Sequence, residues 1–437
     1  MSTARIGVVG EAFLDVHLGQ DSGARSRIGG VLHACRALSA LDASFVCAPI
    51  LPAYLVDSVR AECDTLGGKC TILGSVLGSP NIAIYRDTLE SGDQGVVMPT
   101  FGASHRCVVQ ADGLRDLASD VSDVLVIPGC YASAEVTRQL SEAGVRVHVD
   151  IAYDTDFGSL LRGPQLETAF VSTSSDLFLA RWGASPARAW DELSPIAKVV
   201  VLKESRGGSR AYSLDGVTTA PAFVGSAQHS VGVGDSFDAA HICLRSREAH
   251  DRLRSSSAIA AAYADTWDQE RFATVTCGIV DGSEALEDHA QIRLPWERRP
   301  GYGIYVAAPD FPSVDVRPLN RLVSALEYHN FLCRLPIREN GLADDGLAGN
   351  ALKPICDADL RLLDECELLV AVLLYDDPGT LIEIGIAAER GLPVIVYDPY
   401  DRARNVMLRC VPRMVSSELS DVVTAVFQSI GEMNAET

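Results

Sequence analysis

Residues 375–387 read YDDPGTLIEIGIA, and they follow an apolar run, LLVAVLL, at 368–374. A short, continuous aliphatic run that ends in turn residues is typical of a buried parallel strand. The residues after the Pro-Gly pair have a helix pattern in which Glu383 is the one carboxylate among leucine and isoleucine. Such a carboxylate is costly unless it has a partner or a use, and α/β proteins bind ligands at the carboxyl ends of their strands. The stretch therefore predicts either a functional Glu383 or the solvated face of an amphipathic helix.

Strand and helix patterns alternate along most of the remaining chain. Apolar segments such as SFVCAPI, DVLVIPG, VRVHVDI, KVVVLKE and PVIVY are separated by helical spacing and by glycine turns. This alternation predicts the α/β class, with mostly parallel sheets covered by helices on both faces. At 437 residues the chain exceeds one ordinary domain, and the segment QIRLPWERRPGYG at 291–303 is proline-rich and lacks periodicity. We therefore expect a domain at 1–297, a linker at 298–303 and a second domain at 304–437.

The composition limits the classes of protein. The chain is 47% hydrophobic with a net charge of -21, which permits large cores and argues against nucleic acid or an anionic membrane as a partner. The 12 cysteines include no C-x-x-C pair and the 9 histidines show no metal-ligand spacing, so we predict free thiols and no metal site. The amino terminus, MSTARIGVVGEAF, lacks the features of a signal peptide, and no apolar run could span a membrane. We expect a cytoplasmic protein that acts on small molecules.

A second informative stretch, GVGDSF at 232–237, stands where the chain passes into a helix pattern. The backbone N–H groups of such a turn and the dipole of the following helix attract anions, which suits a transferring phosphoryl group. Asp235 at that point could accept the proton of a substrate hydroxyl. The alternative is a glycine-rich turn whose aspartate only caps the helix.

Three segments resemble the ribokinase-like (PfkB) carbohydrate kinase family over residues 4–297. They are GEAFLD at 10–15, the diglycine helix IGGVLHACRALSALD at 28–42 and GVGDSF. The resemblance implies a three-layer αβα fold and a sugar or nucleoside kinase that uses ATP and Mg²⁺. It makes Asp235 the catalytic base. The other implied roles are substrate contacts for Asp15, Gly30 and His33, an anion hole of Gly232, Val233 and Gly234, and a nucleotide side that includes Lys203 and Gly208.

The first domain departs from this family's usual residues at three places. The usual residues are an aspartate-threonine pair before the glycine turn, an asparagine after the diglycine and an Asn-x-x-Glu motif. The corresponding residues here are His229-Ser230, His33 (or Ala34) and Thr173-x-x-Asp176. The expected fold is unaffected. The departures leave open a second reading, in which the domain binds a nucleotide or nucleoside without turning it over.

The second domain resembles the nucleoside 2-deoxyribosyltransferase family. The matching segments are IYVAAPDF at 304–311, CELLVAVLLYDDPGTLIEIGIAAERGLPVIVY at 366–397 and RNVML at 404–408. The resemblance implies a smaller doubly wound (Rossmann-like) parallel α/β domain that uses no cofactor. The implied roles are a nucleophile at Glu383, its positioning by Tyr305, sugar-hydroxyl binding by Asp377, a reach into a neighbouring subunit's site by Asn405, and a carboxylate at Glu367 where the family has aspartate.

These residue types suit the cleavage of an N-glycosidic bond. The reaction passes through an oxocarbenium-like state, which an adjacent carboxylate such as Glu383 can stabilise or capture covalently. A second carboxylate, Glu367 or Asp377, could protonate the leaving base or hold the attacking base or water.

Two functions from different classes follow for the whole chain. The first is a two-activity enzyme of nucleoside or nucleotide metabolism, which cleaves or exchanges a base and phosphorylates a sugar or nucleoside. The second is an antiphage-type effector in which the kinase-like domain is a nucleotide sensor that gates a nucleotide or NAD glycohydrolase. A catalytically dead scaffold is disfavoured because Asp235 and Glu383 are both present. The two resemblances imply a homo-oligomer, because ribokinase-like proteins often dimerise through their lids and deoxyribosyltransferase sites are completed between subunits. If both contacts form, we expect a large assembly, since two separate self-contacts need not close.

Overall fold

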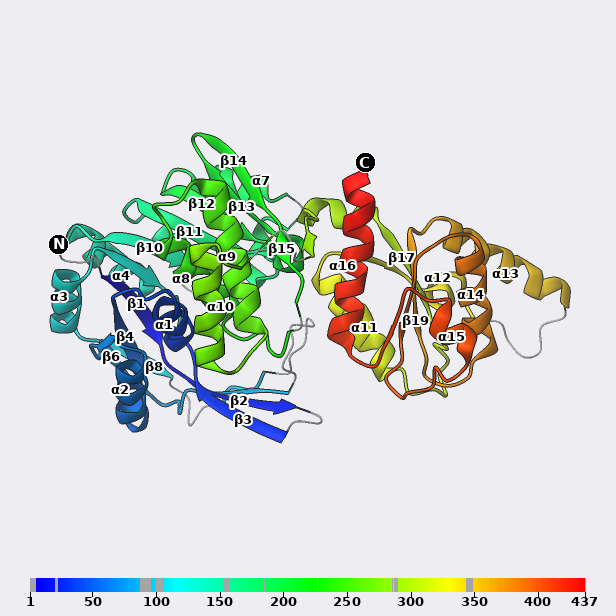
Figure 1. Ribbon diagram of the computed structural model, residues 1–437, viewed down its shortest axis with the longest axis horizontal. Helices are drawn as coiled ribbons and strands as arrows, with labels where there is room; N and C mark the ends of the chain where they lie inside the picture. The colour runs from blue at the N-terminus through cyan, green and yellow to red at the C-terminus, as the bar shows by residue number, and fades with distance from the viewer. Residues whose placement is uncertain are drawn as a thin grey trace. The chain divides into compact units, whose positions relative to one another are not determined.

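A computed structural model describes residues 5–19, 23–86, 96–99, 105–151, 157–183, 185–225, 227–284, 286, 290–342 and 349–436 (Figure 1). The chain forms two compact units, which adjoin in the sequence at Gln291 and Ile292. We call them the amino-terminal unit and the carboxyl-terminal unit. Each is built around its own largely parallel sheet. Among the described residues, none of the helices has the length and apolar character needed to cross a bilayer.

The amino-terminal unit is organised around an 11-stranded sheet with the order β14-β13-β12-β11-β10-β9-β1-β4-β6-β8, and β5 pairs with β4. Its central strands run parallel and are almost fully buried, which explains their continuous aliphatic sequences. The pattern at 199–213 predicts a strand, a glycine turn and a return strand, and the structure forms them as the antiparallel pair β12 and β13. The strand bounds are β1 (Ile6–Glu11), β4 (Phe45–Leu51), β5 (Lys69–Cys70), β6 (Gly74–Leu77), β8 (Arg106–Val109), β9 (Asp123–Val126), β10 (Arg146–Asp150), β11 (Leu166–Ser172), β12 (Ala197–Lys203), β13 (Ser209–Ser213) and β14 (Gly216–Ala220).

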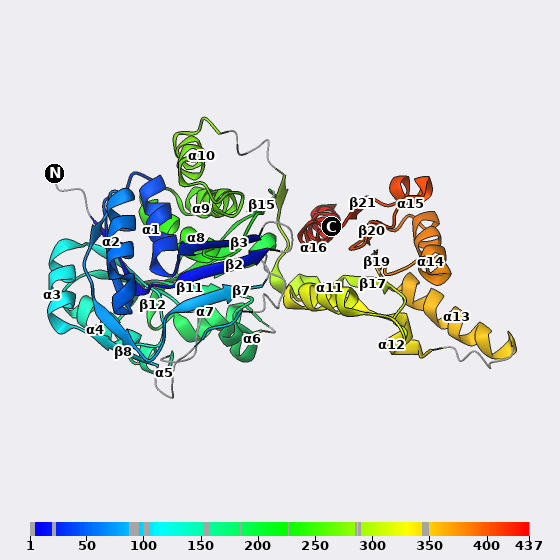
Figure 2. The same ribbon diagram turned by 90° about the horizontal axis from the view of Figure 1, so that it is seen from below.

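Helices cover both faces of this sheet, so the unit has the expected three layers (Figure 2). One face carries α1 (Val31–Ala40), α8 (Val233–Cys243), α9 (Ala249–Ala264) and α10 (Gln269–Asp281), whose apolar residues share one core with β1 and β4. The other face carries α3 (Ala111–Asp120), α4 (Ser133–Glu142) and α7 (Ala187–Leu193). The remaining short elements are η1 (Ala53–Leu55), α2 (Val56–Thr65), α5 (Phe157–Leu160), α6 (Asp176–Arg181), η2 (Ser205–Gly207), β15 (Ala222–Phe223) and β16 (Gln291–Ile292).

A separate small sheet has the order β3-β2-β7. It consists of β2 (Leu14–Gly19), β3 (Gly23–Ile28) and β7 (Ile82–Tyr85), with β2 antiparallel to β3 and parallel to β7. Because β2 follows β1 after two residues, Asp15 on β2 is held close to the carboxyl end of β1.

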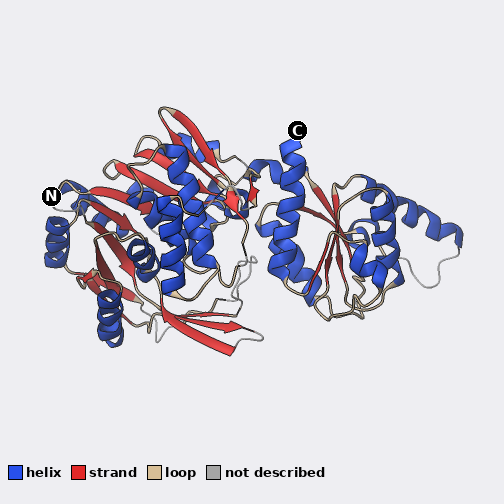
Figure 3. Ribbon diagram, in the orientation of Figure 1, coloured by secondary structure: helices blue, strands red, loops and turns tan. Residues whose placement is uncertain are grey.

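The carboxyl-terminal unit contains a five-stranded parallel sheet with the order β18-β17-β19-β20-β21. Helices lie on both of its faces (Figure 3). The chain order reverses between β17 and β19, and such a topological switch point is where doubly wound α/β proteins bind ligands. The bounds are β17 (Gly303–Ala307), α11 (Arg317–Tyr328), β18 (Leu332–Arg334), α12 (Pro336–Asn340), α13 (Gly349–Asp364), β19 (Leu368–Val372), α14 (Pro378–Glu389), β20 (Val394–Tyr397), α15 (Val406–Cys410), β21 (Met414–Ser416) and α16 (Leu419–Glu436).

The segment expected to be a linker is folded. The helical turn η4 (Trp296–Gly301) includes Arg299, which is fully buried and donates a hydrogen bond of 3.1 Å from Nη1 to the carbonyl of His329. The division between the compact units falls a few residues earlier, after Gln291. In the irregular loop expected at 340–350, residues 343–348 lie outside the described residues.

Candidate functional site

Tyr305 and Glu383 meet at the switch point of the carboxyl-terminal unit. Tyr305 lies on β17 and is 1% exposed, and Glu383 lies in the second turn of α14 and is half-buried. The Tyr305 hydroxyl donates a hydrogen bond of 2.6 Å to Glu383 Oε1. Because one carboxylate oxygen is fixed by the phenol, the orientation of the whole Glu383 side chain is defined.

The turn between β19 and α14 places Glu383 there. Asp377 caps α14, since its Oδ2 accepts hydrogen bonds from the Thr380 N–H at 2.7 Å and from the Thr380 hydroxyl at 2.8 Å. Pro378 occupies the first helical position, where its missing N–H is not needed. The sequence Asp-Pro-Gly-Thr therefore starts the helix directly after the strand, and Asp377 has a structural role whether or not it also binds a sugar.

The surroundings of Glu383 change its protonation. Burial raises its pKa from 4.5 to about 7, the hydrogen bond from Tyr305 opposes this rise, and the negative charges of Asp359 and Asp377 add to it. Burial and the neighbouring Glu383 charge raise the pKa of Tyr305, so the phenol keeps its proton. Glu383 is therefore partly ionised near neutral pH, with a neutral donor beside it.

Asp359 is a site residue that the sequence reasoning missed. It lies half-buried on α13, and its Oδ1 accepts a hydrogen bond of 2.8 Å from Asn340 Nδ2. The negative charge of Asp359 contributes to the raised pKa of both Tyr305 and Glu383, so Asp359 lies within electrostatic reach of the site. The signal available in the sequence was the pair of aspartates in DADL at 357–360, in a stretch with a helix pattern.

The structure does not bring Glu367 to this site. Glu367 precedes β19, and its Oε2 accepts a hydrogen bond of 2.5 Å from the Gly303 N–H at the start of β17. The site lies beyond the other end of β19, which has 5 residues. At a rise of about 3.3 Å per residue, the two ends of β19 are roughly 16 Å apart. Glu367 thus holds the amino ends of two strands together.

Asn405 lies on an exposed surface of the same unit. It caps α15, and its Oδ1 accepts a hydrogen bond of 2.9 Å from the Met407 N–H. The apolar side chains of Val406, Met407 and Ile382 are 67%, 63% and 61% exposed. Ile382 precedes Glu383 on α14.

The second candidate site is the amino terminus of α8. Gly232 caps this helix with φ of 79°, and a β-carbon on it would stand 2.2 Å from Cγ of His33, so this position requires glycine. Val233 begins the helix, and a β-carbon on Gly234 would stand 3.3 Å from Nζ of Lys203. The helix amino terminus and the Lys203 ammonium therefore place positive potential at one point, as an anion requires.

Lys203 is held by two aspartates. Its Nζ lies 3.1 Å from Asp150 Oδ2 and 2.8 Å from Asp238 Oδ2. Burial lowers the pKa of Lys203, but the two carboxylates outweigh this effect and raise it. Burial and the charge of Asp150 raise the pKa of Asp235 to about 7, whereas Lys203 opposes the rise. Asp235 is therefore poised to exchange a proton near neutral pH. Asp150 and Asp238 were missed because nothing in the sequence pairs them with Lys203.

Asp15 and the diglycine are also in contact. A β-carbon on Gly29 would stand 1.9 Å from Asp15 Oδ2, and one on Gly30, where φ is 61°, would stand 2.1 Å from the Glu11 carbonyl oxygen. His33 Nε2 donates to Asp15 Oδ2 at 2.9 Å, and His33 Nδ1 accepts from the Tyr263 hydroxyl at 2.8 Å. Burial raises the pKa of Asp15 to about 6 and keeps His33 neutral by lowering its pKa. The predicted substrate residues Asp15, Gly30 and His33 thus come together, with both ring nitrogens of His33 bonded to protein groups.

Other predicted positions are occupied by structural contacts. His229 Nε2 donates to the Thr266 carbonyl at 3.1 Å, and its Nδ1 lies 3.3 Å from Arg27 Nη2. Thr173 donates to the Lys203 carbonyl at 3.3 Å. Gly208 has φ of 108°, and a β-carbon on it would stand 2.4 Å from the Ala220 carbonyl oxygen, so the turn between β12 and β13 requires glycine.

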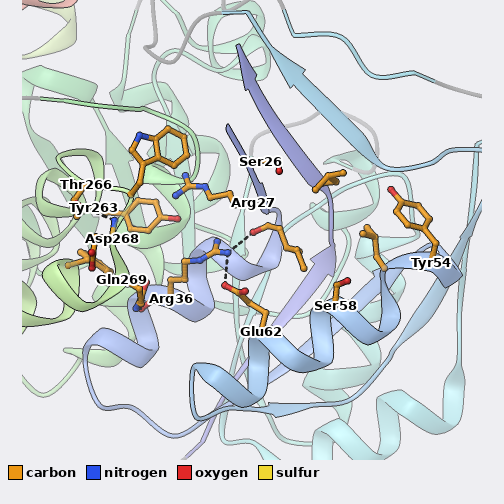
Figure 4. Close-up of a pocket in the computed structure, with 15 residues that line it drawn as sticks. Ser26, Arg27, Arg36, Tyr54, Ser58, Glu62, Tyr263, Thr266, Asp268 and Gln269 are labelled. Atoms are coloured by element: carbon orange, nitrogen blue, oxygen red, sulfur yellow. Dashed lines mark hydrogen bonds and ion pairs between the residues drawn. The ribbon is translucent and has the colours of Figure 1, made fainter. Parts of the chain in front are cut away.

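A pocket of about 540 Å³ lies in the amino-terminal unit, beside Tyr263 and Thr266 (Figure 4). It is lined by residues of β3, α1, α2 and the segment 263–272, including Arg27, Arg36, Glu62, Tyr263 and Trp267. Arg36 donates from Nη2 to Glu62 Oε1 at 2.8 Å, whereas its Nη1 is buried without a hydrogen bond among the described residues. The pocket is large enough for a small organic molecule.

Comparison with known proteins identifies the two units. Residues 304–418 match the family described as nucleoside 2-deoxyribosyltransferase. The fold of the amino-terminal unit is similar to that of a fructokinase with bound ATP from Xylella fastidiosa, with a TM-score of 0.50 and 14% identity over 64% of this chain and 99% of that one. It is also similar to a Burkholderia thailandensis nucleoside kinase in complex with inosine, with a TM-score of 0.50 and 16% identity over 65% of this chain and 98% of that one. No curated protein matches the chain.

The fold class follows directly from these findings. The amino-terminal unit has the ribokinase-like fold of the PfkB carbohydrate kinases. The carboxyl-terminal unit contains a nucleoside 2-deoxyribosyltransferase domain.

Proposed function

We propose that the carboxyl-terminal unit cleaves or exchanges the N-glycosidic bond of a nucleoside-type substrate. The observation that carries this proposal is the hydrogen bond from Tyr305 to Glu383 Oε1, which engages one of the two carboxylate oxygens. Glu383 Oε2 attacks the anomeric carbon, the bond from that carbon to the base breaks, and its electron pair passes to the base. The leaving base takes up a proton from water. Water or a second base then displaces Glu383.

The direct test is product analysis with the full-length protein. Deoxyinosine and free adenine should yield hypoxanthine and deoxyadenosine, detected by mass spectrometry, and the yield should vanish in Glu383→Ala. Incubation with NAD in place of deoxyinosine distinguishes the glycohydrolase function, since it should release nicotinamide. If Glu383→Ala releases a base at the wild-type rate, the assigned nucleophile is refuted.

For the amino-terminal unit we propose a nucleotide-binding site that transfers a phosphoryl group. The terminal phosphate lies against the N–H groups of Gly232 to Gly234 and against the Lys203 ammonium, whose positive charge stands at the helix start. ATP with Mg²⁺ would supply the phosphoryl group and the charge neutralisation of its oxygens. Asp235, with a pKa of about 7, accepts the proton of the attacking hydroxyl.

This second activity is tested by measuring ADP formed from ATP with a panel of sugars and nucleosides. The fold neighbour that binds inosine makes nucleosides a natural part of the panel. Asp235→Ala should abolish ADP formation while nucleotide binding persists. If the wild-type protein binds ATP but forms no ADP with any substrate, the result contradicts the kinase function and supports the sensor function.

We further propose that the deoxyribosyltransferase domain associates with a second copy of itself. The support is the exposure of three apolar side chains, Ile382 next to Glu383 in the chain and Val406 and Met407 next to Asn405. Covering this surface with a second copy would exclude water from the site and add Asn405 of one copy to the site of the other.

A further inference from the structure

The amino-terminal unit contains a group of donor atoms that neither proposed activity uses. Glu11 ends β1, and His105 and Cys107 lie at the start of β8, an edge strand of the same sheet. Glu11 Oε1 is 3.3 Å from His105 Nε2 and 3.5 Å from Cys107 Sγ, and His105 Nε2 is 3.7 Å from Cys107 Sγ. One oxygen, one nitrogen and one sulfur therefore form a nearly equilateral triangle.

These separations are those of a tetrahedral metal site. With bonds of about 2.0 to 2.3 Å from zinc to oxygen, nitrogen and sulfur, the ligand atoms of a tetrahedral site stand roughly 3.3 to 3.6 Å apart. A carboxylate, an imidazole and a thiolate together suit Zn²⁺ rather than Mg²⁺ or Ca²⁺, which prefer oxygen ligands alone.

Hydrogen bonds from neighbouring residues orient the carboxylate of Glu11. Its Oε2 accepts a hydrogen bond of 2.8 Å from the Cys130 N–H, and a β-carbon on Gly129 would stand 2.3 Å from the same oxygen. Asn81, which is 1% exposed, donates from Nδ2 to Glu11 Oε1 at 3.3 Å and to the Ala12 carbonyl at 3.2 Å. Groups that orient a ligand in this way are a regular feature of metal sites.

The group also has access to solvent. Glu11 is buried, whereas the His105 side chain is 21% exposed and Cys107 is half-buried. The fourth position of a tetrahedral ion would therefore remain open to water or to a substrate atom, as in zinc sites with three protein ligands.

We propose that Glu11, His105 and Cys107 bind one Zn²⁺ ion with an open fourth position. Binding releases the thiol proton of Cys107 to solvent, and the thiolate, the neutral imidazole and the carboxylate each give one bond to the ion. The sequence shows no metal-ligand spacing because Glu11 is 94 residues from His105. Only the pairing of strands in the sheet brings the three side chains together.

Cobalt binding to the metal-free, untagged full-length protein tests the proposal. Co²⁺ should bind with a stoichiometry of one per chain, produce thiolate-to-cobalt charge-transfer absorption and the strong visible bands of four-coordinate Co²⁺, and be displaced by Zn²⁺. Cys107→Ala should remove the charge-transfer absorption, and Glu11→Gln should weaken binding by at least about tenfold. Cys277→Ala, which removes an exposed cysteine of the same unit, should leave the spectrum unchanged.

Two results would overturn the proposal. One is the absence of Co²⁺ and Zn²⁺ binding at micromolar concentration, which would make the group a hydrogen-bonded cluster only. The other is a charge-transfer absorption that survives in Cys107→Ala. Circular dichroism of each variant shows whether it is folded, and Glu11→Gln, which conserves the shape of the side chain, provides the test if Cys107→Ala does not fold.

Discussion

The hydroxyl of Tyr305 donates a 2.6 Å hydrogen bond to Oε1 of Glu383, although 78 positions separate the two residues in the chain. The bond joins the first strand of the carboxyl-terminal sheet to the helix after its third strand. A buried carboxylate in contact with a neutral donor can be ionised without a cation, because the donor replaces part of its lost hydration. The chemistry proposed for this unit depends on that contact.

Tyr305→Phe should slow base release by about 10- to 100-fold, which corresponds to the roughly 1.5–3 kcal/mol of a hydrogen bond to a charged group. The bond favours the ionised form of Glu383, so its loss should also move the acidic limb of the pH–rate profile to higher pH. Steady-state rates between pH 5 and 9 measure both effects. If Tyr305→Phe is slower but its pH–rate profile is unshifted, the hydroxyl of Tyr305 does not affect the ionisation of Glu383.

Glu383→Gln should remove part of the pH dependence of stability. The folded protein holds the Glu383 proton up to about pH 7, whereas the unfolded chain releases it near 4.5. The contribution of Glu383 to the free energy of unfolding is therefore fully present below pH 4.5 and is lost as the pH rises through 7. Because the side chain is only half-buried, we expect the variant to be more stable than wild type at pH 8 by about 1–2 kcal/mol, relative to their difference at pH 4. Urea denaturation at both pH values measures the free energy of unfolding. If that free energy changes equally between pH 4 and pH 8 in the two proteins, the prediction is contradicted.

Asp359→Asn and Glu367→Gln form a matched pair. Removing the Asp359 charge should lower the pKa of Glu383 and move the acidic limb of the rate profile to lower pH. Glu367→Gln keeps an oxygen that can accept from the Gly303 N–H and should leave the profile unchanged. If Glu367→Gln shifts the pH–rate profile and Asp359→Asn does not, Glu367 and not Asp359 acts on Glu383.

Lys203→Met should destabilise the amino-terminal unit by about 3–5 kcal/mol, because it leaves Asp150 and Asp238 buried without their cation. Replacing Asp238 with Asn in the same chain should recover part of the loss, since one unpaired charge is removed. Calorimetry of the full-length protein should show the lower transition temperature in the single variant. A single variant as stable as wild type would mean that the ion group contributes little.

Met407→Asp should dissociate the expected oligomer and lower base release, because a charge on the exposed apolar surface opposes its burial between copies. Sedimentation velocity and the base-release assay measure the two effects. Leu214→Asp, at a residue of the amino-terminal unit that is 93% exposed, serves as the control and should change neither. A wild-type chain that sediments as a monomer at micromolar concentration would refute the association.

Some features of this protein follow from local sequence alone. The aliphatic run before Asp377 could only be a buried strand, and Asp-Pro-Gly-Thr supplies a helix cap, so β19, α14 and the position of Glu383 were predictable. The glycines at 29, 30 and 232 were also informative, because a side chain or a backbone carbonyl lies too close to each of them for any other residue. The two resemblances added Tyr305 and Asp235, which local patterns do not distinguish from core and capping residues.

Only the tertiary structure decided which charged groups meet. Glu367 and Asp359 are both carboxylates near β19, but one lies at the amino end of the strand and the other on a helix that faces Glu383. Lys203 finds its partners 53 and 35 residues away, and Glu11 meets His105 through the order of strands in a sheet. Secondary structure is set by neighbours in the chain, whereas ion pairs, pKa shifts and metal ligands depend on distances of a few ångströms that packing alone fixes.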